Sequence, residues 1–402
     1  MTERAVLRNR DFGLYWAGVV FSQIGTRAAV AANLFHVYAL TGSIAQTGLV
    51  GAAQAVALVV LSPLGGALAD RMDRRRLLAI AQGVALVVAA ALAWVTLTGR
   101  VEAWHVLAAV VFTTAAATFD QPARQALIPA LVPREQIGQA IALLNPSREL
   151  AVLAGPLLAG ALIGLSGPGL VYAVDAATYA VLVVGLGLLR IPSTKPEGEP
   201  PSILRSIAEG ARYVRDRPLV VRLMLLDLAA TVFGAYRVLL PAFALDVLGV
   251  GAGAYGVLAA APSAGALLAG YVVFRTIKKS TRQGAVLLTA TALYGVAVLL
   301  LAHAPLFVLA VGAAGLAGAC DAMATTIRHA AVQLDTPDEL RGRVTAFYQM
   351  SSRGGPAVGD TLMGAFAGVV GPVAALTVGA LGPVVVSAVF WARDGVVRSY
   401  RN

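Results

Sequence analysis

Long apolar runs, separated by short polar or Gly/Pro-rich breaks, dominate the chain from residue 13 onward. Each run has about the 20 residues that an α-helix needs to cross a bilayer. Few polar positions interrupt the runs, so they predict helices that are apolar on nearly all sides, as membrane spans are. The expected spans fall in two groups of six, at 13–40, 46–69, 77–98, 103–122, 139–165 and 168–190, then at 219–247, 254–274, 284–303, 305–327, 344–369 and 371–392.

One long polar stretch separates the two groups. It begins with a Pro-rich segment at 192–201, a composition typical of flexible linkers. It continues as a basic amphipathic piece that we expect to lie on the membrane surface. The sequence therefore predicts an N-terminal six-helix bundle at 1–190, a cytoplasmic linker at 191–218 and a C-terminal six-helix bundle at 219–402.

The composition excludes an ordinary soluble enzyme, because only 13% of the residues are charged and 58% are hydrophobic. Soluble domains carry roughly 25% charged residues. A net charge of +10 would suggest a nucleic-acid partner in a soluble protein. With both termini in the cytoplasm, however, 25 of the 31 Lys and Arg residues fall on the cytoplasmic side. Membrane insertion and anionic inner-leaflet lipid account for this charge, so we expect no nucleic-acid partner.

Cofactor chemistry has little support in the sequence. Cys320 is the sole cysteine, which excludes a disulfide and a thiolate metal cluster. The four histidines show no ligand spacing, and no Gly-x-x-x-x-Gly-Lys loop is present to cradle a nucleotide. We therefore expect no metal, no cofactor and no ATP-driven step in this chain.

The charged segment Gly65–Arg76 recurs 204 residues later in altered form. The aligned pairs are Gly66 with Gly270, Arg71 with Arg275, Arg74 with Lys278, and Arg75 with Lys279. Asp70 aligns with Phe274, so its carboxylate exists in one half only. Arg124 aligns with Arg328 at the same offset, whereas Gly155-Pro156 and Gly355-Pro356 match at an offset of 200. Because each half has an even number of spans, the sequence predicts two parallel repeats related by an axis along the membrane normal.

At these residues the chain resembles the major facilitator superfamily over essentially its whole length. Gly66–Arg75 resembles the signature loop between the second and third spans, with Asp73 where the general pattern has Gly. Phe119–Gln125 and Leu131–Glu135 are similar to the drug and siderophore exporters, a branch that includes the enterobactin exporters. The first span departs from that branch, because Thr26 and Arg27 follow Gly25 where an Asp is usual.

The resemblance implies an all-α integral membrane fold of 12 transmembrane helices, working as a monomer by alternating access. It also implies a cytoplasmic latch made by Asp70, Arg74 and Asp120, with Arg71, Arg75 and Arg124 beside it. Gly155–Gly160 is similar to the fifth-span motif of antiporters, with Ala159 in place of a Gly. The alternative is that the latch residues only set topology and turn geometry, and that Asp120 and Arg124 form a helix-end ion pair.

Charged residues inside the expected spans are the candidates for the substrate and proton site. An unpaired charge at these depths costs several kcal/mol, so each must face a cavity or another charge. Asp227 and Asp360 are our first choices for proton coupling; pairing between helices is the alternative. The full set is Gln23, Arg27, Glu149, Asp175, Asp227, Arg237, Arg353 and Asp360.

Gly and Pro within the spans are candidate hinges for a rocking motion, although such residues also serve close packing. The candidates are Gly155, Pro156, Pro262, Gly355 and Pro356.

These observations predict a proton-coupled antiporter in a bacterial inner membrane. It would export an amphipathic organic molecule: a drug, a secondary metabolite or a siderophore. The central arginines Arg27, Arg237 and Arg353 favour a substrate with anionic or phenolic groups. A proton-coupled nutrient importer and a lipid scramblase are the alternatives. An enzyme would need a nucleophile–base pair near one interface, and the sequence offers none.

Overall fold

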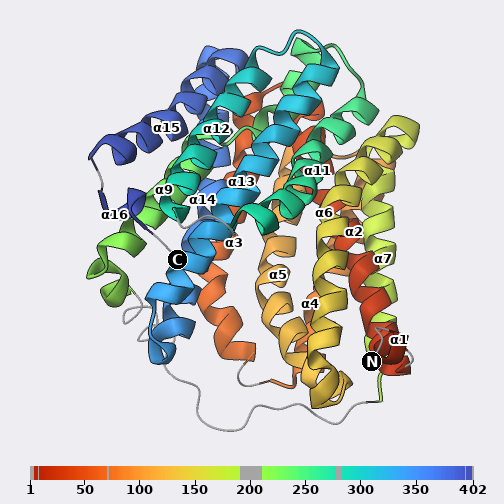
Figure 1. Ribbon diagram of the computed structural model, residues 1–402. Coiled ribbons are helices and arrows are strands. Elements are labelled where there is room, and N and C mark those ends of the chain that lie inside the picture. Colours follow the sequence, from red (N-terminus) through yellow and green to blue (C-terminus); the bar gives the residue numbers. More distant parts are fainter. Residues whose placement is uncertain are drawn as a thin grey trace. The chain divides into compact units, whose positions relative to one another are not determined.

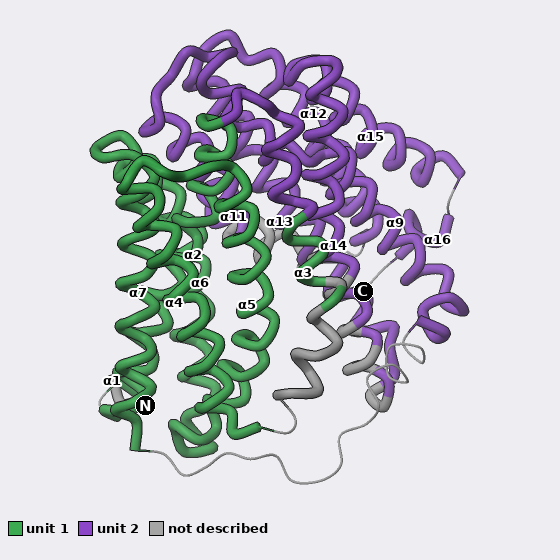
Figure 2. The backbone as a smooth tube through the Cα atoms, turned by 180° about the vertical axis from the view of Figure 1, so that it is seen from behind, with its two compact units in different colours: residues 1–40, 53–200 green, residues 41–52, 201–402 purple. Residues whose placement is uncertain are grey.

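The computed structural model describes residues 4–7, 9–69, 72–190, 211–277, 282–393 and 395–400, and the regular structure in these ranges is helical (Figure 1). These residues form two compact units. Unit 1 comprises residues 1–40 and 53–200, and unit 2 comprises residues 41–52 and 201–402 (Figure 2). Most of the expected linker lies outside the described residues.

Unit 1 contains the helices of the first half of the chain. They are α1 (Arg4–Leu7), α2 (Arg10–Thr41), most of α3 (Ile44–Ala69), α4 (Arg74–Leu97), α5 (Ala103–Leu131), η1 (Arg134–Gln136), α6 (Ile137–Ser166) and α7 (Pro168–Leu188). Helix α4 packs against both α5 and α7, and α6 packs against α7. Small buried side chains let α4, α5 and α7 approach, including Ala85, Ala116 and Ala176.

Unit 2 contains the second half and the start of α3. Its helices are α9 (Pro218–Phe233), η2 (Arg237–Leu239), α10 (Leu240–Ala242), η3 (Phe243–Val247), α11 (Ala252–Ile277), α12 (Gln283–Ala302), α13 (Phe307–Asp335), α14 (Asp338–Val370), α15 (Pro372–Arg393) and α16 (Gly395–Arg398). Helix α13 packs against α11 and α12, and α14 packs against α9. The first residues of α3 belong to this unit because Gly48 lies against Gly364 of α14.

The helices confirm the predicted all-α membrane fold. Each expected span coincides with a helical segment, and the ends differ by a few residues in most cases. Nine segments in the described part of the chain are long and apolar enough to cross a membrane. The other long helices are α2, α3 and α14.

Helix α5 differs from the prediction, which ended the fourth span at 122. The helix continues through Pro122 and Pro129 to Leu131. A proline removes one backbone hydrogen bond, but in membrane helices neighbouring groups can satisfy the carbonyls near it. Here the Tyr15 hydroxyl donates to the carbonyl of Arg124 at 2.9 Å. The predicted end of the span at 122 was therefore wrong, because a proline inside a membrane helix need not end it.

The seventh span is a broken helix. Helix α9 ends at Phe233, and the remainder to Val247 is a succession of 3-10, α and π turns. Gly234 caps α9, and its carbonyl accepts a hydrogen bond from the Tyr294 hydroxyl at 2.7 Å. A glycine, with Pro241 seven residues further on, explains why the regular helix stops in the middle of an apolar run.

Two tight turns show the repeat in the backbone. Helix α6 ends at Gly167 and α14 ends at Gly371, with φ angles of +79° and +85°. The left-handed region favours glycine, and a proline begins the next helix in both cases. The two turns are 204 residues apart, as the sequence repeat predicts.

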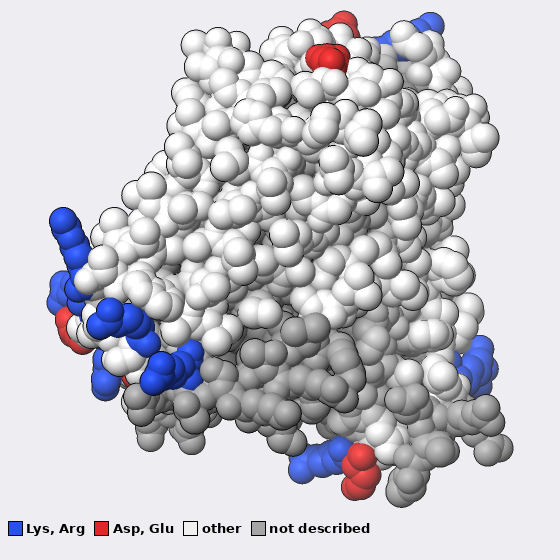
Figure 3. All heavy atoms as spheres, turned by 45° about the horizontal axis from the view of Figure 1, so that its top comes forward, with Lys and Arg blue, Asp and Glu red and all other residues white. Residues whose placement is uncertain are grey.

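The surface is suited to lipid. On the face in Figure 3, charged side chains lie at the margins of the described surface, and the area between them is uncharged. Large apolar side chains such as Leu165, Val308 and Val369 are 77%, 76% and 86% exposed. Exposed apolar surface on this scale is expected where hydrocarbon, rather than water, surrounds the helices.

Candidate functional site

A cavity of about 650 Å³ lies among the helices of unit 1. Its wall combines small apolar residues such as Ala85 and Ala89 with polar and charged side chains. Cavities of this size accommodate drug-sized organic molecules. Among the candidates from the sequence, the cavity is lined by Gln23 and Arg27 of α2, Asp120 and Arg124 of α5, and Asp175 of α7.

A closed ring of polar contacts lies in this wall. Arg124 Nε lies 2.6 Å from Asp120 Oδ2, and each side chain is 12% exposed. Gln82 of α4 donates to Asp120 Oδ1 at 2.7 Å. Ser22 of α2 donates to Gln82 Oε1 at 3.1 Å, and Arg124 Nη2 donates to Ser22 Oγ at 3.2 Å. The ion pair expected from the sequence therefore also ties α2, α4 and α5 together.

The arginines at the start of α4 bind backbone carbonyls. Arg74 Nη1 donates to the carbonyl of Ala126 in α5 at 3.1 Å. Arg75 Nη2 donates to the carbonyl of Gly187 in α7 at 2.9 Å. These contacts hold the start of α4 against the ends of its two packing partners.

The structure describes only some of the residues of the predicted latch. Asp70 and Arg71 lie outside the described residues. Asp120 is bound within the polar ring, and the hydrogen bond of Arg74 goes to a backbone carbonyl instead. The latch of Asp70, Arg74 and Asp120 therefore stays a prediction.

Asp175 lies where α7 packs closely against α2. The residue is 2% exposed, and its Oδ1 has no hydrogen-bond partner among the described residues. Gly25 of α2 permits this approach, because a Cβ there would lie 2.8 Å from Asp175 Oδ1. One turn further along α7, the Tyr179 hydroxyl lies 2.8 Å from Thr26 Oγ1. Asp175 is thus a carboxyl group enclosed by two helices at the edge of the cavity.

Helix α6 contributes a third arginine to the cavity. Arg148 lines it, whereas the neighbouring candidate Glu149 is exposed and does not. Gly155, one of the hinge candidates, lies against Arg27 of α2, since a Cβ on Gly155 would overlap the Arg27 side chain. The glycine thus brings α6 close to the part of α2 that carries Arg27.

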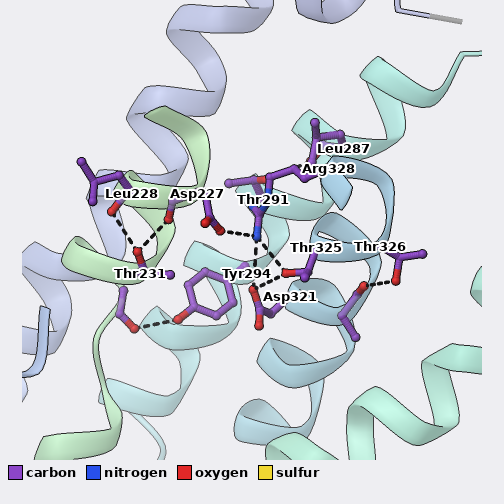
Figure 4. Close-up of polar contacts among 12 residues, drawn as sticks. Asp227, Leu228, Thr231, Leu287, Thr291, Tyr294, Asp321, Thr325, Thr326 and Arg328 are labelled. Carbon is purple, nitrogen blue, oxygen red and sulfur yellow. Dashed lines mark hydrogen bonds and ion pairs between the residues drawn. The ribbon is translucent and has the colours of Figure 1, made fainter. Parts of the chain in front are cut away.

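Unit 2 contains a buried ion pair between helices. Arg328 of α13 lies 2.7 Å from Asp227 of α9, and the two side chains are 1% and 4% exposed (Figure 4). The same Arg328 Nη2 lies 3.7 Å from Asp321 and donates to Thr325 Oγ1 at 2.8 Å. Asp227 and Asp321 thus both lie within ion-pair distance of the Arg328 guanidinium.

The two units hold equivalent arginines in different ways. Arg124 and Arg328 are 204 residues apart, but Arg124 pairs with a carboxylate on its own helix. Arg328 pairs across to Asp227, whose counterpart in unit 1 is Gln23. Asp175 has Gly379 as its counterpart. Duplicated positions have therefore diverged in where they place negative charge.

The second first-choice carboxylate, Asp360 of α14, also has partners. The backbone N–H of Val238 donates to it, and it experiences the positive charge of Arg237. Arg237 is exposed at the start of η2. Arg353 lies on α14, but its side chain is outside the described set. The structure thus brings Asp360 and Arg237 together and leaves Arg353 untested.

The hinge candidates occupy close helix contacts. Helices α6, α11 and α14 continue through Pro156, Pro262 and Pro356. A Cβ on Gly318 would overlap the backbone of Pro262, and one on Gly355 would lie 2.7 Å from a side-chain oxygen of α9. These contacts accord with the close-packing alternative, and a role as hinges stays a prediction.

The glycine contacts also correct the alignment of the repeats. Gly155 lies against the backbone of Arg27 in unit 1, and Gly359 lies against the backbone of Thr231 in unit 2, whereas Gly355 meets only side-chain atoms of α9. Both pairs are related by 204 residues, so Gly359 rather than Gly355 is the counterpart of Gly155. The match at an offset of 200 was wrong, because it followed the Gly-Pro letters instead of the contacts.

Several polar partners were missed in the sequence. Gln82 and Ser22 are uncharged residues within apolar runs, and nothing in their spacing marks them. Arg328 could have been singled out from the sequence, because it repeats Arg124 at the offset of 204 residues. Asp321 precedes Arg328 by seven residues, a spacing that places both on one helix face.

Comparison with known proteins defines the class. The fold is similar to that of the nucleoside transporter NupG, with a TM-score of 0.78 and 13% identity over 95% of this chain and 98% of that one. A bacterial homologue of the human lysosomal transporter Spinster gives a TM-score of 0.75 and 16% identity, covering 98% and 97%. The protein is a multi-pass secondary transporter of the major facilitator superfamily, not an enzyme.

The family follows from the sequence. The family model described as "Transmembrane secretion effector" matches residues 1–394, and the chain belongs to this family. Among its relatives, the enterobactin exporter EntS of Citrobacter koseri is 28% identical over 356 residues, which is 88% of this chain and 83% of that protein. EntS of Escherichia coli O1:K1 is 29% identical over 340 residues, covering 84% and 80%. The predicted superfamily is confirmed, together with its kinship to exporters.

Proposed function

We propose that the protein exports an amphipathic organic molecule bearing anionic or phenolic groups, in exchange for protons. The relatives named as enterobactin exporters support export, and they make a siderophore one candidate substrate. The transporter would act as a monomer in a bacterial inner membrane, with both termini cytoplasmic and anionic lipid along its basic face.

The observation that carries the proposal is the composition of the unit 1 cavity. Alanine side chains line it beside the guanidinium groups of Arg27, Arg124 and Arg148. Apolar walls accept the body of an amphiphile, and a guanidinium binds a carboxylate or phenolate through charge-assisted hydrogen bonds. Arg27 and Arg148 both line the cavity, and they are the residues proposed to orient the substrate.

Proton coupling needs a carboxyl group that changes protonation during the cycle. Asp175, Asp227 and Asp360 are the candidates within the membrane spans. Alternating access would carry the substrate and the proton in opposite directions, with the charged segment at 65–76 as the proposed cytoplasmic latch. The candidate hinges would act in the same rocking motion.

Transport into inverted vesicles tests the proposal. A suitable probe is radiolabelled 2,3-dihydroxybenzoylserine, an aromatic amide with one carboxylate and two phenol groups. With an acidic lumen, we expect uptake that an uncoupler abolishes and that Arg27→Gln lowers about tenfold, because a hydrogen bond to a charged group contributes about 1.5 kcal/mol or more. Arg215→Gln is the control, since that side chain is 77% exposed on the surface. Uptake independent of the pH gradient would contradict proton-coupled export.

A further inference from the structure

Asp175 occupies a position that the packing of unit 1 does not explain. Its Oδ1 is buried and lacks a hydrogen-bond partner among the described residues, although the residue lines the cavity. A buried polar oxygen without a donor costs roughly 1–3 kcal/mol, and more when it is charged. A carboxylate required only for stability would be expected to have a partner, as Asp120 and Asp227 do.

We propose that Asp175 is the carboxyl group that binds and releases the exchanged proton; this assignment rests on the proposed proton antiport. A bound proton removes the buried negative charge that α2 and α7 would otherwise enclose. When the cavity admits water, the O–H bond breaks and the proton passes to that water, leaving a carboxylate that bulk solvent stabilises. The carboxylate is re-protonated from the opposite side of the membrane.

The surroundings of Asp175 fit this role. Gly25 presents bare backbone to the carboxyl group, so α2 supplies no side chain at the point of contact. Thr178 Oγ1 donates to the backbone carbonyl of Asp175 and not to its carboxylate. The Tyr179 hydroxyl bonds to Thr26, the same residue that donates to the carbonyl of Ser22. Neighbouring hydroxyls are thus engaged elsewhere.

Several other titratable and charged groups in and beside the cavity contact one another. Asp120 and Arg124 form an ion pair, and Tyr172 lies 3.1 Å from His36 Nδ1. The groups that share the cavity with Asp175 are Tyr15 and Arg27 of α2, Asp120 and Arg124 of α5, Arg148 of α6, and Tyr172 and Tyr179 of α7.

The repeat gives an independent argument. Helices α7 and α15 are counterparts, yet Asp175 corresponds to Gly379, which packs against the carbonyl of Phe233. The close helix contact needs no acid in unit 2. Helix packing at this position therefore does not require the carboxyl group that unit 1 has.

Transport by Asp175→Asn tests the assignment, because Asn has nearly the same shape and imitates the protonated acid. In inverted vesicles with a lumen one pH unit more acidic and no membrane potential, an exchange of one proton accumulates the labelled 2,3-dihydroxybenzoylserine about tenfold. We expect Asp175→Asn to reduce this ratio to about one while exchange between labelled and unlabelled probe continues. Asp216→Asn is the matched control: its side chain is 66% exposed and does not line the cavity, so this variant should keep the accumulation.

Uphill accumulation by Asp175→Asn that equals wild type would overturn the assignment. If the wild-type protein shows no proton-driven accumulation, the proposed function is contradicted. The proton-binding role of Asp175 is then tested by a second measurement that needs no substrate. Infrared pH titration of the protein in lipid should show a carboxylic acid C=O band that shifts in protein made with [4-¹³C]aspartate and is absent from Asp175→Asn. A band unchanged by that substitution would also overturn the assignment.

Discussion

Removing one partner of the buried Asp227–Arg328 ion pair should destabilise unit 2 far more than breaking an exposed ion pair does. Its atoms lie 2.7 Å apart and both side chains are almost fully buried. Removing one partner from such a pair costs about 3–5 kcal/mol, because the other charge is left in a low-dielectric interior. Asp227→Asn should fall near the lower end, since Asp321 lies 3.7 Å from the same nitrogen and partly replaces the lost charge. Arg328→Met should fall near the upper end.

The pairing is measured with a double-mutant cycle on the free energy of unfolding, followed by far-UV circular dichroism in mixed micelles. The double variant of Asp227→Asn with Arg328→Met should be about 2 kcal/mol more stable than the sum of the single effects, since neither charge remains unpaired. Asp216→Asn is the control. It disrupts an ion pair whose side chains are 77% and 66% exposed and should change stability by less than about 0.5 kcal/mol. Strictly additive effects at Asp227 and Arg328 would refute the reasoning.

Three further predictions concern packing and capping, all measured by the same unfolding assay. Gly265→Ala should destabilise unit 2 by about 1–3 kcal/mol, because its Cβ would overlap the carbonyl of Gly315, whereas Gly312→Ala meets nothing within 4 Å and should be neutral or slightly stabilising. Asp73→Ala should lower the free energy of unfolding by about 1 kcal/mol, since the Asp73 side chain caps α4 by accepting a backbone N–H. Asp73→Asn keeps this acceptor and should cost much less; equal losses for both variants would argue for a role of the charge. Gln82→Leu should cost about 1–3 kcal/mol by removing a 2.7 Å donor to a buried carboxylate, and an unchanged stability would contradict the polar ring.

The fold could be predicted from the sequence because the bilayer imposes one dominant constraint. A run of about 20 apolar residues has few alternatives to a spanning helix. The errors concern proline and glycine within apolar runs, where local rules do not decide whether a helix continues. Pro122 does not end α5, which continues to Leu131. Gly234 breaks the seventh span although the run around it stays apolar.

The site was less predictable, because hydropathy places a charge at a depth but does not give its partner. Asp227 was singled out as a coupling candidate, yet the structure pairs it with Arg328 from a helix about 100 residues away. Asp175 carried no stronger signal in the sequence than Glu149. Only the packing of Gly25 against α7 distinguishes an enclosed carboxyl group from an exposed one.

The direction of proton movement during transport tests the central proposal most directly. Inverted vesicles are loaded with a pH-sensitive dye, with equal pH on both sides, and 2,3-dihydroxybenzoylserine is added outside. An antiporter releases protons from the lumen as the probe enters, so the account predicts a rise in lumen pH that vesicles lacking the protein do not show. A fall in lumen pH would indicate symport and import, and it would contradict the account.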